Sequence, residues 1–136
     1  MNSTLIALTG FVSWTLFLLI LMESIRTKLV LSGSVPANGF DPGNFSLSPF
    51  MQRLARAHAN CIEGLPVFGG LMLIAVISGK AGITDPLAYI FLTFRVLQSV
   101  IHLSSVSAPA VTARFSAFAV QIAIGVYWAW RMLVSF

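Results

Sequence analysis

Four polar residues recur at helical spacing inside an otherwise apolar segment of this chain. They are Arg53, Arg56, Asn60 and Glu63. At about 100° of rotation per residue, these four residues occupy an arc of about 80° on one face of a helix. Ionisable groups at membrane depth are costly, so they usually face a protein interior or a wet cavity and serve a function. This polar stripe therefore predicts a binding site on a membrane-spanning helix.

A second polar face follows in the next apolar segment. Arg95, Gln98 and His102 have similar spacing and again share one narrow helix face. A short turn joins the two segments, so they should pack antiparallel, with their polar faces at similar depth. We expect these faces to meet each other or to meet a neighbouring subunit.

The charges of the two faces do not cancel. Three arginines stand against the single carboxylate of Glu63, an excess of two positive charges. Uncompensated charge in a low dielectric is expensive, so this surplus calls for an anionic ligand. Arginine suits carboxylates, Glu63 suits an ammonium group and Asn60 suits a peptide amide. A small zwitterionic peptide with extra carboxylates meets all three needs, whereas phosphate or an anionic lipid headgroup meets only the cationic part. Simple pairing of Glu63 with Arg95 or Arg56 is the structural alternative.

The composition places these residues in a membrane. The chain has 136 residues, of which 57% are hydrophobic and 9% charged, whereas soluble domains carry about 25% charged residues. Its length suits one compact domain, residues 1–136. The eight Lys and Arg residues are spread along the whole chain, so we expect no nucleic-acid partner. Cys61 is the single cysteine, which excludes an intrachain disulfide and a cysteine metal motif; no metal site is predicted.

Apolar runs and breakers predict an all-α membrane protein, a bundle of four transmembrane helices. The helices should cover about 4–30, 49–79, 86–106 and 110–134. The first of them should be a retained anchor, because no cleavage site follows it. Ser48-Pro49 and Asp85-Pro86 each offer an N-cap with proline at the first helical position. Pro66 should kink the second helix.

The basic residues orient the bundle. Five of them lie in or near the first and third connections, namely Arg26, Lys28, Arg53, Arg56 and Arg114. The opposite side carries only Lys80 and Arg131. Because cytoplasmic loops are enriched in Lys and Arg, we expect cytosolic first and third connections and non-cytosolic termini.

The run Arg56-Ala-His-Ala-Asn60-Cys-Ile-Glu63-Gly-Leu-Pro66 resembles the second-helix signature of the MAPEG family, membrane-associated proteins in eicosanoid and glutathione metabolism. The resemblance extends over essentially the whole chain, including Ala108-Pro109 before the fourth helix. It implies a homotrimer of four-helix subunits in membrane lipid, with glutathione bound between subunits near the cytosolic face.

The resemblance also implies which residues bind glutathione. The expected set comprises Arg26 at the end of the first helix, Arg53, Arg56, Asn60 and Glu63 in the second, and Arg95 and Gln98 in the third. This chain departs from the catalytic members of the family in one important respect. They carry an arginine close to the Ala-Pro of the last turn, which holds the glutathione thiolate, and residues 104–111 contain none.

Thiol activation therefore has two candidates. A thiol with a free pKa of about 8.5 is mostly protonated at neutral pH, and a close cation is the usual remedy. Arg114, one turn into the fourth helix, could supply that cation, and His102 could act as a base.

Two functions follow from these residues. The first is a glutathione-dependent transferase or peroxidase that acts on an apolar electrophile or a lipid peroxide from the bilayer. The alternative is a non-catalytic membrane scaffold, or a binder of lipid or small anions, that keeps the cationic site. A channel is disfavoured, because the charged cluster lies at one mouth and no polar path continues through the bundle.

Overall fold

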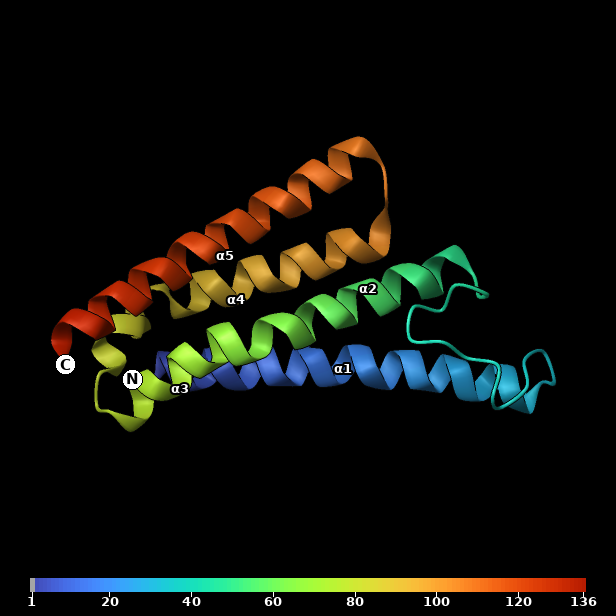
Figure 1. Cartoon of the computed structure of the whole chain (residues 1–136), viewed down its shortest axis with the longest axis horizontal. Helices are drawn as coiled ribbons and strands as arrows, with labels where there is room; N and C mark the ends of the chain where they lie inside the picture. Colours follow the sequence, from blue (N-terminus) through green and yellow to red (C-terminus); the bar gives the residue numbers. More distant parts are fainter. Residues whose placement is uncertain (1) are drawn as a thin grey trace.

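A computed structural model describes residues 2–136, and all of its regular structure is helical (Figure 1). The elements are α1 (Ser3–Leu31), α2 (Pro49–Gly64), the π-helical turn η1 (Leu65–Gly69), α3 (Gly70–Ile77), α4 (Ala81–Ser104) and α5 (Ala108–Ser135). α2, η1 and α3 run on without a break from Pro49 to Ile77. Within the described residues, four helical segments are thus long and apolar enough to cross a membrane, which confirms the predicted four-helix class.

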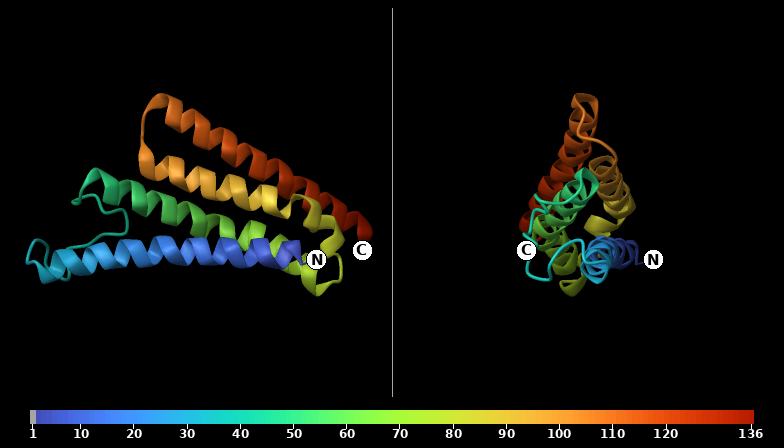
Figure 2. Two further views of the ribbon diagram at one scale, coloured as in Figure 1. Left: turned by 180° about the vertical axis from the view of Figure 1, so that it is seen from behind. Right: turned by 90° about the vertical axis from the view of Figure 1, so that its right-hand side faces the viewer.

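The helices run alternately up and down the bundle. Both termini lie at one end, the terminal end, and residues 32–48 and 105–107 lie at the other, the loop end (Figure 1). α5 packs along α4 near the termini and separates from the other helices toward the loop end (Figure 2).

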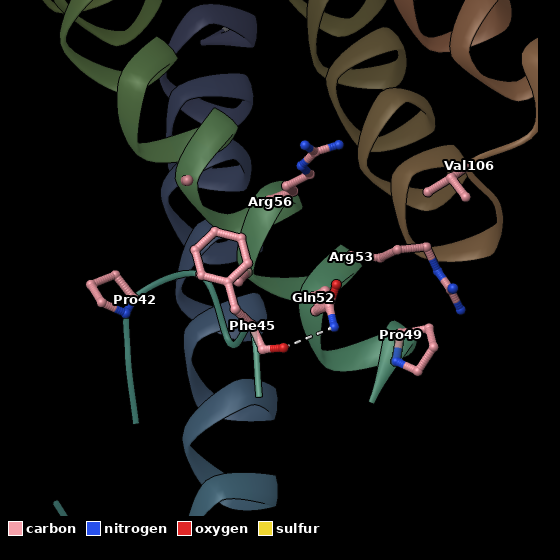
Figure 3. Close-up of a pocket in the computed structure, with 10 residues that line it drawn as sticks. Pro42, Phe45, Pro49, Gln52, Arg53, Arg56 and Val106 are labelled. Atoms are coloured by element: carbon pink, nitrogen blue, oxygen red, sulfur yellow. Dashed lines mark hydrogen bonds between the residues drawn. The ribbon is translucent and has the colours of Figure 1, made fainter. Parts of the chain in front are cut away.

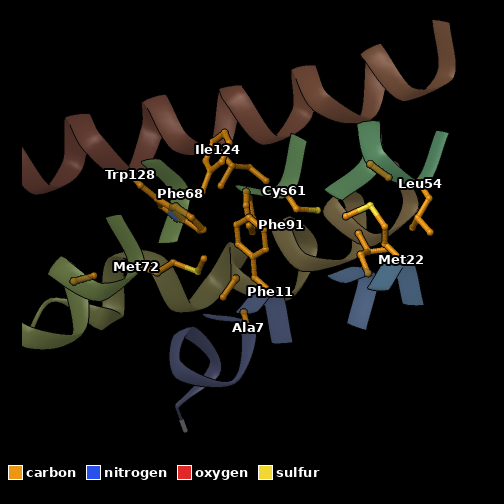
Figure 4. Packing of buried hydrophobic residues seen from close by; sticks show 14 of the residues in the cluster. Ala7, Phe11, Met22, Leu54, Cys61, Phe68, Met72, Phe91, Ile124 and Trp128 are labelled. Carbon is orange, nitrogen blue, oxygen red and sulfur yellow. The ribbon is translucent and has the colours of Figure 1, made fainter. Parts of the chain in front are cut away.

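An aromatic cluster fills the centre of the bundle (Figure 4). The ring of Phe91 on α4 lies 5.7 Å from Phe11 on α1, 5.0 Å from Phe68 in η1 and 5.6 Å from Trp128 on α5, between centroids. Lipid tails are as apolar as these side chains, so burial from water does not drive this association. Close packing and hydrogen bonds between helices must hold the bundle together instead.

The third span begins earlier than the sequence predicts. We expected it to start at Pro86 with Asp85 as its cap, but α4 starts at Ala81 and contains Pro86 in its second turn. The Asp85 carboxylate instead bonds to α1. Its Oδ1 accepts hydrogen bonds from the backbone N–H of Thr4 at 2.9 Å and from the Thr4 hydroxyl. Asp85 thereby caps the start of α1, where a carboxylate also faces the positive end of the helix dipole.

Ser48 caps the start of α2, and Pro66 lies in the π-helical turn that follows its end. Ser48 caps α2 as predicted, since its hydroxyl accepts from the Met51 N–H at 3.3 Å and proline follows at Pro49. Pro66 lies inside η1. A π-helical turn is wider than an α-helical one and often occurs at functional sites, so the proline that we expected to kink the helix is accommodated by this turn.

The long connection at the loop end is held by a buried asparagine. Asn44 is fully buried and has a φ of 55°, in the left-handed region. Its Oδ1 accepts from Nε and Nη2 of Arg26, at 3.1 and 2.5 Å, and its Nδ2 donates to the Met51 carbonyl at 2.8 Å. Asn44 therefore ties the connection to the end of α1 and the start of α2.

We expect Asn44→Ala to destabilise the protein by roughly 2–3 kcal/mol, since it leaves the Nε of Arg26 without its acceptor and places alanine at positive φ. Thermal unfolding in detergent should show a lower midpoint, and limited proteolysis should cleave within residues 32–48. Asn38→Ala is the control, because Asn38 is exposed in the same connection. Equal midpoints for the two variants would contradict this role of Asn44.

Candidate functional site

The polar stripe of α2 lies along the edge of the bundle. Arg53 and Asn60, on one margin of the stripe, are half-buried toward α4, whereas Arg56 and Glu63, on the other margin, are exposed. The stripe thus presents one margin to the interior of its own bundle and the other to the surroundings of the helices.

Arg95 lies inside the bundle. Its side chain is fully buried, with its guanidinium carbon 5.2 Å from the ring centroid of Phe11, 6.0 Å from that of Phe68 and 5.9 Å from that of Phe118. Aromatic faces attract a cation, and a desolvated guanidinium gains most from them. Arg95 is therefore held in an aromatic cage rather than by a carboxylate.

Asn60 joins the two polar faces. Its Oδ1 accepts from Nη1 of Arg95 at 2.5 Å and from Nε2 of Gln98 at 3.1 Å. The polar faces of α2 and α4 thus meet within one chain, which decides between the two arrangements open from sequence. Gln98 is in turn bonded to Gln121 of α5, whose Nε2 donates to Gln98 Oε1 at 2.8 Å.

Arg53 caps the C-terminal end of α4. Its Nε donates to the carbonyl of Leu103, in the last turn of that helix, at 2.9 Å. A cation at this position satisfies a free carbonyl and faces the negative end of the helix dipole.

A pocket of about 510 Å³ opens beside Arg53 and Arg56 (Figure 3). Phe45 and Pro42 border it from the long connection, and Val106 borders it from the turn between α4 and α5. Its volume falls in the range of about 300–1,000 Å³ that small-molecule sites usually have. Apolar walls with two arginines suit a ligand that has an apolar part and an anionic group.

Glu63 pairs with neither Arg95 nor Arg56. Across residues 2–136 the only ion pair within 4.0 Å joins Arg26 to Glu23, at 3.0 Å. Glu63 is exposed on a membrane-spanning helix. The simple pairing considered from sequence is therefore wrong within one chain, and both Arg56 and Glu63 remain open to an outside partner.

Arg26 is occupied inside its own chain. Besides Asn44 and Glu23, it donates to the Asp41 carbonyl at 3.1 Å, and its guanidinium carbon lies 5.4 Å from the ring centroid of Phe40. Its direct contact with glutathione stays a prediction, and that contact would require some of these bonds to be exchanged.

The two catalytic candidates lie on different helices near the loop end. His102 of α4 is buried, and its Nδ1 has no hydrogen-bond partner among residues 2–136. Arg114 of α5 is half-buried and lies within electrostatic range of His102, as do Arg56 and Arg95. The charged groups that act on His102 are therefore three arginines.

Sequence reasoning missed two residues of this site. Gln121 is fully buried and completes the hydrogen bonds between α2, α4 and α5; a lone glutamine in the apolar run 115–130 was the available signal. Gly64 lies against Arg95, because a Cβ added there would stand 2.9 Å from Arg95 Nη2. Nothing in the sequence alone marks Gly64, since that contact depends on how α2 meets α4.

The fold and the site together define an integral multi-pass membrane protein with a polar network inside a four-helix bundle and a cationic pocket at one end of it. The profile of the MAPEG family matches residues 4–134. The chain therefore belongs to this family of membrane proteins of eicosanoid and glutathione metabolism, and the resemblance seen in the sequence is confirmed. Neither a curated protein nor a solved structure matches the chain significantly.

We expect Gly64→Ala to displace the guanidinium of Arg95, which its aromatic cage leaves little room to move. The loss of stability should be about 1–3 kcal/mol, typical of overpacking, and thermal unfolding in detergent should show a lower midpoint. Gly70→Ala, in the same continuous helix, is the control because a Cβ there meets nothing within 4 Å. It should leave stability unchanged or raise it by about 0.5–1 kcal/mol. A stable Gly64→Ala variant would show that Arg95 is not confined.

Proposed function

We propose that the protein is a glutathione-dependent transferase or peroxidase that acts on an apolar electrophile or a lipid peroxide. The observation that carries the proposal is the pair Arg56 and Glu63. Both are exposed along a membrane-spanning helix, one turn to either side of Asn60, and neither has an ion-pair partner in the described chain. Opposite charges left open in this way suit a zwitterionic ligand, because unpaired charge at this depth is expensive.

The parts of glutathione match the parts of this site. Arg53 and Arg56 can hold carboxylates through paired N–H donors, and Glu63 can hold the ammonium group. Asn60 lies between them and can bond the peptide backbone of the ligand. The apolar second substrate would come from the membrane lipid, where its solubility concentrates it.

The assembly and its orientation are part of the proposal. A homotrimer would place a neighbouring subunit against the exposed margin of the stripe and so enclose the ligand between subunits. The loop end would face the cytosol, because it carries five of the eight Lys and Arg residues.

Titration calorimetry of the detergent-purified protein with glutathione tests the binding step. We expect binding at millimolar or lower concentration, and we expect Arg56→Ala and Glu63→Gln each to weaken it by about tenfold or more, as the loss of a charge-assisted contact does. Lys28→Ala is the control, because Lys28 is an exposed cation at the same end. The absence of any heat at millimolar glutathione would refute the proposal.

Catalysis would depend on a cation beside the thiol. We expect Arg114→Ala to lower kcat by about 100-fold, as removal of a group that stabilises reacting charge does, with little change in the KM for glutathione. A cation lowers the pKa of a nearby thiol, so the pH–rate profile of this variant should move to higher pH. Measurement of conjugation to an apolar electrophile across pH checks both effects. An unchanged profile, with His102→Gln inactive instead, would assign thiol activation to His102.

A second function is favoured by the pocket of Figure 3, whose walls are mostly apolar. A non-catalytic member of the family would use it to hold an anionic lipid or small anion as part of a membrane scaffold. Extraction and mass spectrometry of lipids from the purified protein separates the two functions. A stoichiometric anionic lipid without glutathione turnover would favour this second function, and turnover without such a lipid would favour the enzyme.

A further inference from the structure

The orientation of the Asn60 amide is determined by its neighbour. Oxygen and nitrogen of an amide have similar shapes, so hydrogen-bond partners must decide which is which. Arg95 decides it here, because a guanidinium has donors and no acceptor. The Asn60 atom that lies 2.5 Å from Arg95 Nη1 is therefore the oxygen.

At the opposite end of the network, the orientation of the Gln121 amide is determined by backbone carbonyls and does not depend on Asn60. Gln121 is fully buried, and the two hydrogens of its Nε2 are shared among three acceptors: Gln98 Oε1 and the backbone carbonyls of Ala117, at 3.1 Å, and Phe94, at 3.3 Å. Carbonyls only accept hydrogen bonds, so the atom of Gln121 at this position must be the nitrogen. Gln121 therefore presents its nitrogen, a donor, toward Gln98 in either orientation of the Gln98 amide.

Gln98 links these two ends and can take only one orientation. Its Oε1 faces the Gln121 donor at 2.8 Å, and its Nε2 faces the Asn60 oxygen at 3.1 Å. If the Gln98 amide were reversed, nitrogen would face nitrogen on one side and oxygen would face oxygen on the other. Arg95 and Gln121 therefore impose a single direction on every hydrogen bond between them.

This direction of the hydrogen bonds leaves one group of the Asn60 side chain, its Nδ2, without a partner among residues 2–136. Its Oδ1 accepts two hydrogen bonds, which fill the two lone pairs of a carbonyl oxygen. Its Nδ2 bonds to no atom within residues 2–136, and the residue is half-buried at the margin between the bundle and the exposed Arg56 and Glu63. Asn60 can therefore donate to a ligand but cannot accept from one.

We propose that Arg95, Gln98 and Gln121 are positioning residues that fix Asn60 as a donor, so that the ligand must place an acceptor there. This inference rests on the proposed function and specifies the ligand group at that site, a carbonyl, carboxylate or thiolate. Glu63, one turn further along α2, takes the donor or ammonium group of the same ligand. Donors at Arg56 and Asn60 and an acceptor at Glu63 give the stripe two different ends, which set the direction in which a peptide ligand lies.

The variant Asn60→Asp tests the inward oxygen and the outward nitrogen of the Asn60 side chain separately. The carboxylate keeps an oxygen for Arg95 and Gln98 and strengthens the first bond by charge, while the outward donor becomes an acceptor. We expect a thermal midpoint equal to or above that of the wild type, together with a glutathione Kd raised about tenfold or more. Asn60→Asp with wild-type affinity would overturn the donor assignment, and a lowered midpoint would overturn the assigned direction of the network.

Gln121→Met tests positioning from a residue that does not reach the stripe. It removes the donor that fixes Gln98, so we expect the Kd for glutathione to rise about three- to tenfold while Asn60 itself is intact. Thr84→Val is the matched control, because it deletes a buried hydroxyl bond to Thr4, of 2.6 Å, at the terminal end. It should lower the midpoint and leave the Kd unchanged. Equal Kd values for Gln121→Met and the wild type would overturn the positioning role.

These measurements also separate this inference from the proposed function. If the wild type binds no glutathione, the proposed function fails, and the midpoint of Asn60→Asp still decides the direction of the network. If the wild type and Asn60→Asp bind glutathione equally, the proposed function stands and the inference fails.

Discussion

Arg95 places a positive charge at the centre of the bundle, where no carboxylate of the described chain lies within ion-pairing distance. A buried cation of this kind is tolerable only if its surroundings are arranged around it. Three phenylalanine rings from three elements face the guanidinium, Asn60 bonds to it, and Gly64 leaves room for it. The packing of α1, η1, α4 and α5 at this level follows from the need to accommodate that one group.

The same need connects the fold to the site. Because Arg95 and Gln98 hold the inner margin of the stripe, Arg56 and Glu63 on the outer margin stand at a fixed place along the edge of the bundle. At the loop end, Asn44 and Arg26 hold the long connection over the start of α2 and so form one wall of the pocket. The site therefore depends on contacts that a ligand does not itself make.

Sequence patterns predicted well those features that depend on neighbours along the chain. Four spans, the cap at Ser48 and the grouping of Arg95 and Gln98 with Asn60 follow from apolar runs and helical spacing. The errors arose where a residue bonds to a distant element. Asp85 and Pro86 resemble a helix start, but the Asp85 carboxylate caps α1, which lies about 80 positions away in the chain. Arg26 likewise bonds to the connection that follows it, and its predicted contact with glutathione stays a prediction.

The sequence by itself determined that this is a four-helix membrane protein of the MAPEG family with a polar stripe on its second span, since hydrophobic length and helical period are local properties. Only the tertiary structure decided which polar residues face inward and which face outward. Helical spacing places Arg53, Arg56, Asn60 and Glu63 on one arc, but the line along which α4 meets that arc assigns Asn60 to the interior and Glu63 to the exterior. Only the tertiary structure likewise shows that Gln121 belongs to the hydrogen-bond network, because hydrogen bonds between helices depend on how those helices pack.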